Sequence, residues 1–404
     1  MRFSPIFIVA TAQAFKSSFI NLGGVKHHVR DTGDCGDGPL ALFFHGFASC
    51  ASSFEDVAPL LAAQHCRCIA VDRVAFGLTE RPAPVSLPAP PRFPGAATLA
   101  ASLEGGGGPQ LLAGGLLPEA RAAIASGLRR PETLAPSLPW TLAGFKGDPY
   151  APEFQLEALS KLLRRRLAAR ERDVYMIGHS AGGPYALRAC TELDLPRGHK
   201  IAGCALIAPA VLDPREDPEA YGDFDAPDLL EFLPEVVPED IRNRAETEAR
   251  NAAFGTLLAL PDAFALPTAR RIGEDRNFTE AVLGQMHPRM GAPEHEGTIR
   301  RCVVKYTEAV ELDDTWDVGL LRHYRAERAS EVETGRAMIA RAKGTEAKFL
   351  TVTGDVDRIV PPSATATVAD LLGAEARTLA ETGHLPLDER PREVAEMLLE
   401  FIGS

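Results

Sequence analysis

The feature of this chain that most restricts its fold is the alternation of short apolar runs with amphipathic segments. The five runs that we expect to form buried strands are PLALFFHG (39–46), RCIAVD (67–72), DVYMIG (173–178), IAGCALIAP (201–209) and AKFLTVTG (347–354). Strands that alternate with helices form a mostly parallel sheet that is covered on both faces. The sequence therefore predicts an α/β fold, with residues 19–33 as an antiparallel hairpin that leads into the sheet.

The segments around these runs carry apolar residues at helical spacing. The predicted apolar faces consist of Phe54, Val57, Leu60 and Leu61 in residues 53–64, and of Leu156, Leu159, Leu163 and Leu167 in residues 152–170. Residues 391–402 predict a last helix that closes the chain. Helices with one apolar face are suited to cover the sheet.

Two segments interrupt the alternation and divide the chain. Residues 83–147 are rich in Pro, Gly and Ala and lack periodicity, so we expect a flexible insertion, with an entrance-covering loop as the alternative. Residues 211–330 contain amphipathic patterns and predict a helical cap between two strands of the sheet. The expected core comprises residues 17–210 and 331–404, preceded by an N-terminal extension at residues 1–16.

Charge and hydropathy exclude several classes of partner. The net charge of -12 and the pI of about 5.4 disfavour binding to nucleic acids and to anionic membrane surfaces. No apolar run approaches the length of a membrane span. The first residues, MRFSPIFIVATAQA, resemble a signal peptide, but their apolar stretch is at or below the usual minimum. We therefore favour a cytoplasmic protein, with a secreted or organellar one as the alternative.

The cysteines do not predict a disulfide framework or a metal site. Their number is odd and their spacing is scattered: Cys35, Cys50, Cys66, Cys68, Cys190, Cys204 and Cys302. The pair Cys66 and Cys68 does not have a metal-binding spacing. We expect small buried hydrophobic side chains, such as Cys68 and Cys204 inside strands.

The stretch DVYMIGHSAGGPYALRAC places one serine between two glycines, after an apolar strand and before a helix. A serine at such a turn adopts a strained backbone conformation that projects its Oγ. Side chains two positions away on either side would collide, which explains Gly178 and Gly182. The helix N-terminus then directs the N–H of Ala181 toward a developing oxyanion. Ser180 is therefore the candidate nucleophile.

A serine needs a base, and the base needs an orienting acid. LTVTGDVDRIVPP ends a strand and turns, and the later TGHLPLDERP supplies a histidine ahead of the last helix. The order Ser180, Asp357, His384 agrees with one known arrangement of such triads. Two other acids compete with Asp357: Asp355, two residues earlier, and Asp213, which follows the preceding strand.

Taken together, these motifs resemble the α/β-hydrolase superfamily, in its group of capped serine esterases and C–C hydrolases. Its patterns are matched by FHGF (44–47), VDRVAFGLTERP (71–82), GHSAGG (178–183), GDVDRIVP (354–361) and GHLP (383–386). The second of these resembles Asp-x-x-Gly-x-Gly-x-Ser-x-x-Pro, with Thr79 in place of the Ser, and we interpret Asp72 and Arg73 as structural. The resemblance covers about residues 17–82 and 148–404.

The resemblance assigns roles around the triad. It implies an α/β-hydrolase fold with an inserted helical cap, and an oxyanion hole formed by the backbone N–H groups of Phe47 and Ala181. It gives His45 and Gly46 the task of shaping the oxyanion loop, and it packs His179 under the turn. The mechanism needs no metal and no organic cofactor.

The resulting expectation is hydrolysis of a small hydrophobic ester or thioester through an acyl-enzyme, by a monomer or homodimer. A C–C bond hydrolase or a perhydrolase with the same triad is the first alternative. A ligand receptor or pseudoenzyme is the second. Because the nucleophile is Ser180 rather than a carboxylate, aspartate-dependent epoxide hydrolases and dehalogenases are disfavoured.

Overall fold

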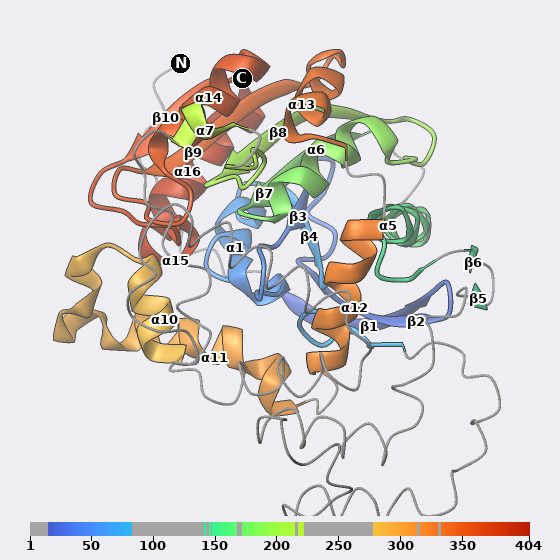
Figure 1. Ribbon diagram of the computed structural model, residues 1–404. Coiled ribbons are helices and arrows are strands. Elements are labelled where there is room, and N and C mark those ends of the chain that lie inside the picture. The colour runs from blue at the N-terminus through green and yellow to red at the C-terminus, as the bar shows by residue number, and fades with distance from the viewer. Residues whose placement is uncertain are drawn as a thin grey trace, which may run out of the picture.

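The computed structural model shows a central sheet with helices on both faces (Figure 1). It describes residues 15–82, 141–142, 145–146, 148–167, 172–214, 217–221, 278–312, 316–329 and 333–404. The expected N-terminal extension and nearly all of the expected insertion at 83–147 lie outside these residues. Within 83–147 the structure describes the short strands β5 (Thr141–Leu142) and β6 (Phe145–Lys146), which pair with each other.

The main sheet has eight strands in the order β1-β2-β4-β3-β7-β8-β9-β10. They are β1 (Lys16–Leu22), β2 (Val25–Asp31), β3 (Leu40–Phe44), β4 (Arg67–Val71), β7 (Arg172–His179), β8 (His199–Ile207), β9 (Lys348–Gly354) and β10 (Glu375–Leu379). β1 pairs with β2 and β2 with β4 in antiparallel fashion, and all other neighbours are parallel. The predicted hairpin and the predicted parallel sheet are confirmed.

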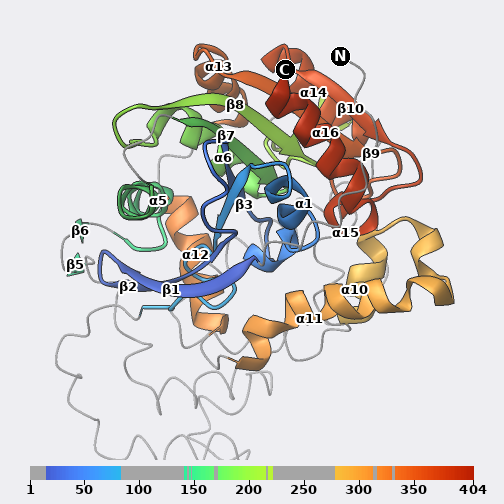
Figure 2. The ribbon, with the colours of Figure 1, turned by 180° about the vertical axis from the view of Figure 1, so that it is seen from behind.

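Helices cover the sheet as two layers, which Figures 1 and 2 show from opposite sides. One layer contains α5 (Pro152–Arg166), α6 (Gly182–Glu192), α13 (Gly335–Lys343) and α14 (Pro362–Leu372). The other contains α1 (Ala58–Ala62) and α16 (Pro391–Gly403). The remaining helical elements are η1 (Ala51–Phe54), α7 (Pro218–Tyr221), α10 (Phe278–Gln285), η3 (Pro288–Gly291), η4 (Pro293–His295), α11 (Glu296–Leu312), α12 (Trp316–Ala329) and α15 (Pro386–Glu389).

The alternation of side chains along a strand builds both layers of the core. All five residues of β3 are buried. Leu40 and Leu42 belong to the cluster under α5 and α6, whereas Ala41 and Phe43 belong to the cluster under α1 and α16. Successive side chains point to opposite faces of a sheet, so a strand that is covered on both sides is apolar throughout.

The prediction of one helix over residues 53–64 is wrong. The segment is divided into the 3-10 turn η1 and the short helix α1. Pro59 has no N–H to donate and stands in the first turn of α1, where this donor is not needed. Phe54, Val57 and Leu61 are buried as expected, but Leu60 is exposed.

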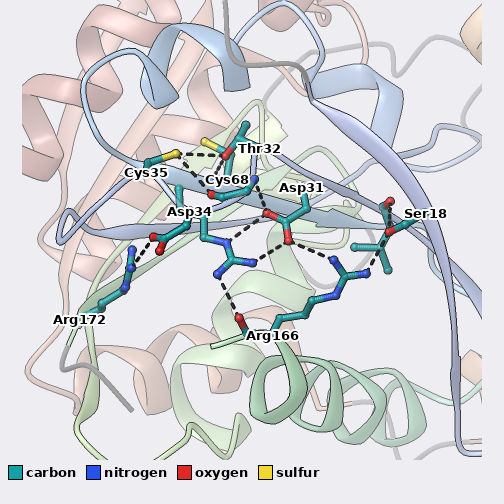
Figure 3. Close-up of polar contacts among 11 residues, drawn as sticks. Ser18, Asp31, Thr32, Asp34, Cys35, Cys68, Arg166 and Arg172 are labelled. Atoms are coloured by element: carbon teal, nitrogen blue, oxygen red, sulfur yellow. Dashed lines mark hydrogen bonds and ion pairs between the residues drawn. The ribbon is translucent and has the colours of Figure 1, made fainter. Parts of the chain in front are cut away.

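Ion pairs tie the end of β2 to its neighbours, as Figure 3 shows around Asp31. Arg67 on β4 donates from Nε and Nη2 to the two carboxylate oxygens of Asp31, at 3.1 and 2.7 Å. Arg166 at the end of α5 reaches the same carboxylate and also donates to Ser18 Oγ at 3.0 Å. This paired arrangement satisfies the buried Asp31 and joins two strands and a helix.

Three further expectations concern the chain as a whole. All seven cysteines are free and buried, as predicted. Over the residues that the structure describes, no helix has the length and hydropathy needed to cross a membrane. The same residues contain no cluster of His, Cys, Asp and Glu suited to hold a metal ion.

A buried lysine joins the helical segment, which consists of α10, α11 and α12, to the core. Lys305 on α11 lies 2.8 Å from Asp388 Oδ1, 3.4 Å from Glu55 Oε1 and 3.6 Å from Asp56 Oδ2. Burial alone lowers the pKa of Lys305, but the carboxylates, Asp388 above all, outweigh it and raise the pKa above its usual value. The described residues 278–312 and 316–329 are thus largely helical, and α11 is anchored to the core. Residues 222–277 of the expected cap lie outside the described residues, and the role of 211–330 as a cap remains a prediction.

We expect Lys305→Met to lower the free energy of unfolding by about 3–5 kcal/mol, because it leaves the carboxylate of Asp388 buried without its partner. Lys161→Met is the matched control: Lys161 pairs with Glu157 on the surface of α5, and its loss costs less than about 0.5 kcal/mol. Urea unfolding measures both. Equal effects of the two substitutions would contradict the prediction.

Candidate active site

The candidate nucleophile occupies the sharp turn between β7 and α6. Ser180 has a φ of 51°, in the left-handed region that side chains other than glycine rarely adopt. Its N–H donates to Ile207 O at 2.9 Å, and its carbonyl accepts from the N–H groups of Gly183 and Ala210 at 2.8 and 3.1 Å. These bonds from both sides hold a backbone conformation that would otherwise relax.

The two glycines are required by the surrounding backbone. A Cβ at Gly178 would lie 2.6 Å from Gly182 O, and a Cβ at Gly182 would lie 2.0 Å from Phe44 O. Neither position leaves room for any side chain. The structure therefore gives the collisions that the spacing of these glycines around Ser180 predicts.

The three residues of the predicted triad meet in space. His384 Nε2 lies 2.9 Å from Ser180 Oγ, and His384 Nδ1 lies 2.8 Å from Asp357 Oδ2. All three side chains are buried. With Nδ1–H donating to the carboxylate, Nε2 is the acceptor for the serine hydroxyl, which is the tautomer that a general base needs.

The structure also separates the three candidate acids. Asp357 Oδ1 accepts from the N–H groups of Ile359 and Val360 at 2.8 and 2.9 Å, so its other oxygen is directed at His384. Asp355 is exposed and its Oδ1 accepts from the N–H of Thr382 at 3.1 Å, which caps the turn. The charges of Asp213 and Asp357 both act on Tyr221, so the contact of Asp357 with His384 is what distinguishes these two acids. The acid in contact with the histidine is therefore Asp357.

The loop after β3 passes directly beside the serine. A Cβ at Gly46 would lie 3.2 Å from Ser180 Cβ, so only glycine allows the approach without displacement. His45 Nδ1–H donates to Gly46 O at 2.8 Å, and His45 Nε2 accepts from the N–H of Arg73 at 3.0 Å. Burial, and secondly the charge of Arg73, lowers the pKa of His45 to about 3. A neutral histidine with both nitrogens in use fits the expected shaping role.

His179 lies under the turn, as expected, and supports the candidate base. Its Nε2–H donates to the carbonyl of His384 at 2.9 Å. Burial, and secondly the nearby His384, lowers the pKa of His179 to about 4. His179 is therefore neutral near pH 7 and fixes the backbone of His384.

Sequence reasoning missed the contacts that hold the histidine loop from the other side. Glu389 accepts from the N–H of Gly383 at 3.0 Å and from the N–H of His287 at 2.9 Å. The N–H of His384 donates to Gln285 O, at the end of α10, at 2.6 Å. No local pattern distinguishes Glu389 from other acids, because one of its two partners, His287, lies about a hundred residues earlier in the chain.

Comparisons with known proteins identify the fold. The family model described as alpha/beta hydrolase fold matches residues 39–391. A search of the curated proteins finds no match.

Solved structures match nearly the whole chain at low identity. A thermophilic esterase from Thermogutta terrifontis is 14% identical with a TM-score of 0.54, and the match covers 96% of this chain and 98% of that one. A putative lipase from Acinetobacter baumannii AYE is 14% identical with a TM-score of 0.54 over 97% and 92%. A 2-hydroxy-6-oxo-6-phenylhexa-2,4-dienoate hydrolase from Rhodococcus sp. strain RHA1 is 16% identical with a TM-score of 0.50 over 96% and 100%. At these identities the likeness shows the fold alone.

The contacts of the two neighbouring acids predict opposite effects of the same substitution. Asp357→Asn keeps the shape but favours the wrong tautomer of His384, so ester turnover falls about a hundredfold or more while the protein stays folded. Asp355→Asn stays within about tenfold of the parent, because Asp355 lies outside the hydrogen-bonded chain. The measurement is turnover near neutral pH, with circular dichroism as the folding control. An inactive Asp355→Asn beside an active Asp357→Asn would reverse the assignment.

The environment of Glu389 predicts a dependence of stability on pH. Burial raises the pKa of Glu389 from 4.5 to about 7, against the opposing hydrogen bonds from His287 and Gly383. Between these pH values the folded protein keeps a proton that the unfolded chain has lost, so stability falls as the pH rises through this window. The loss is about 3 kcal/mol for a shift of this size.

Glu389→Gln removes this titration, so the stability of the variant declines less than that of the parent over the same window. Urea unfolding at pH 4.5, 6 and 8 measures the difference. Glu393→Gln, which changes a half-exposed surface carboxylate on α16, is the control and follows the parent. Identical pH profiles for the parent and Glu389→Gln would contradict the raised pKa.

Proposed function

The chain belongs to the α/β-hydrolase fold family, and from this premise we propose that it is a serine hydrolase of small hydrophobic carboxylic esters or thioesters. The observation that carries the proposal is the continuous set of hydrogen bonds from Ser180 through His384 to Asp357, with the serine on a strained turn before a helix. No one of these residues has this chemistry alone; together they supply a nucleophile, a base and an orienting acid.

In the first half of the reaction, His384 Nε2 takes the proton of Ser180 while Oγ attacks the carbonyl carbon of the substrate. The carbonyl π electrons move onto the oxygen and create an oxyanion. The backbone N–H groups of Phe47 and Ala181 would receive this oxyanion, since Ala181 begins the turn into α6 and the Phe47 loop runs beside Ser180. Asp357 holds the positive imidazolium in place.

Collapse of the tetrahedral intermediate restores the carbonyl and breaks the bond to the leaving group. The leaving alcohol or thiol takes the proton from His384 Nε2, which leaves an acyl group on Ser180. A water molecule then gives its proton to the same nitrogen and attacks the acyl carbon. The second collapse returns the proton to Ser180 Oγ and releases the carboxylic acid.

Aromatic side chains near the loop support an apolar substrate. The ring of Phe47 lies 5.8 Å from that of Phe76, which in turn lies 4.8 Å from the ring of His323 on α12. In both views α12 lies beside α5 and near strands β1 and β2 (Figures 1 and 2). We propose that α12 and the rest of residues 211–330 form a cap that selects the substrate by size and polarity.

The structure offers a sharp control for the nucleophile. Ser17 Oγ also lies 2.7 Å from a histidine nitrogen, His28 Nε2, and His28 Nδ1 lies 2.7 Å from Asp72 Oδ2. Yet Ser17 lies within strand β1, where its backbone pairs with Arg30 of β2 rather than turning into a helix. This second set has the same three residue types without an elbow. It therefore tests whether the elbow is needed to activate a serine.

We expect a fluorophosphonate probe to label the protein at Ser180 alone, because among the serines that the structure describes Ser180 alone combines the base with an elbow and a helix N-terminus. Mass spectrometry locates the label. Ser180→Ala abolishes both labelling and turnover of simple esters, whereas Ser17→Ala retains both.

Undiminished labelling of Ser180→Ala would falsify the assignment. A substrate panel of esters of increasing chain length, thioesters and dienoate-type ketones then separates ester hydrolysis from C–C bond hydrolysis. A protein that binds these compounds but turns over none of them is a receptor on this fold.

A further inference from the structure

An arginine stands behind the loop that we assign to the oxyanion hole. Arg73 follows β4 and is 5% exposed. Its Nη2 donates to the carbonyl of Gly46 at 3.2 Å and to that of His45 at 3.3 Å. The guanidinium lies over the rings of Tyr185 and Phe76, 4.4 and 4.8 Å from their centroids. It is therefore held by backbone carbonyls and aromatic faces.

The charge of Arg73 is not cancelled by a carboxylate. No ion pair to Arg73 is present among the residues that the structure describes, and its Nε and Nη1 are buried without a hydrogen-bond partner. Arg67 and Arg188, by contrast, are paired with Asp31 and with Glu192. A buried cation without a counter-ion is costly and exerts a strong local field. Burial first and the charge of Arg73 second lower the pKa of His45, against the opposing charge of Asp72.

The carbonyl that Arg73 contacts belongs to the peptide group that ends in the N–H of Phe47. Gly46 O accepts from Arg73 Nη2 and, at 2.8 Å, from His45 Nδ1–H. Two donors on one carbonyl fix the plane of the peptide. They also draw electrons toward the oxygen, which makes the N–H at the other end a stronger donor. The cationic donor has the larger effect.

We propose that Arg73 is a positioning residue that strengthens the oxyanion hole through the Gly46–Phe47 peptide. It orients and polarises this peptide and places an uncancelled positive charge behind it. The inference rests on the proposed function, because the oxyanion exists only if Ser180 attacks a carbonyl. Its effect grows with the negative charge on the substrate oxygen, so it stabilises the transition state more than the bound ester.

The test compares Arg73→Gln, which removes the charge, with Arg73→Lys, which keeps it. Removing a direct oxyanion donor costs about a hundredfold to a thousandfold in kcat, so loss of a group that acts through a donor should cost about thirtyfold. We expect Arg73→Gln to lower kcat by this factor with KM within about twofold. Arg73→Lys should recover kcat to within about fivefold of the parent.

A comparison of two inhibitors accompanies the kinetics. An alkyl boronic acid forms a tetrahedral anion on Ser180, whereas the corresponding alkyl ketone without activation binds as a neutral ligand. The inhibition constant of the boronic acid should rise about thirtyfold in Arg73→Gln, and that of the ketone should not change. If Arg73→Gln does not fold, the same ratio in Arg73→Lys decides, with an expected rise of about threefold for the boronic acid alone.

Arg67→Gln is the matched control, since Arg67 is a buried arginine whose charge is paired with Asp31. It should lower stability and leave the ratio of the two inhibition constants unchanged. Equal changes for boronic acid and ketone in a folded Arg73 variant, or a change in KM alone, would overturn the inference. A parent protein that neither hydrolyses esters nor binds the boronic acid would refute the proposed function itself.

Discussion

The close approach of backbone segments around Ser180 is the constraint on which the rest of the site depends. Gly182 is packed against Phe44 O so tightly that an added Cβ would lie 2.0 Å away, and Gly46 is packed against Ser180 itself. This packing holds Ser180 at a φ of 51°, a conformation that costs about 1–3 kcal/mol for a residue with a side chain. Backbone hydrogen bonds with Ile207 at the end of β8, with Ala210 beyond it and with Gly183 of α6 maintain it. The elbow is thus produced by the packing at this edge of the sheet. It directs the Oγ of Ser180 toward His384.

The candidate base is held from several directions by groups far apart in sequence. Asp357 bonds its ring, His179 bonds its carbonyl and Gln285 of α10 bonds its N–H. Helix α10 therefore contributes to the position of His384. Lys305 makes the same connection by charge, since its partner Asp388 lies four residues after His384. We expect a substitution that displaces α10 or α11 to shift the candidate base as well. The contacts of both helices end on the loop that carries His384.

Periodicity made the five core strands, the first hairpin and the helices α5 and α16 predictable, since each depends on residues that are neighbours in sequence. The triad was predictable for the same reason: each of Ser180, Asp357 and His384 follows a strand within a short motif. The helix over 53–64 was not, because Pro59 starts a new turn inside an otherwise suitable apolar pattern. Arg73 and Glu389 were not assigned their contacts either. Their partners, Gly46 and His287, are brought to them only by the tertiary fold.

The two Ser-His-Asp sets described in this chain have the same residue types, so their comparison shows what else a reactive serine needs. Ser17, His28 and Asp72 have hydrogen bonds as short as those of Ser180, His384 and Asp357. Both acids also accept from two backbone N–H groups, Asp72 from those of Ala51 and Leu78 and Asp357 from those of Ile359 and Val360. The acids therefore do not distinguish the two sets. A serine and a base lower the barrier to attack only where donors await the charge that the attack creates. In the proposed mechanism the start of α6 and the loop backed by Arg73 supply these donors at Ser180, whereas at Ser17 the backbone is engaged in the sheet. The surroundings of the serine, more than its two partners, decide which set is suited to catalysis.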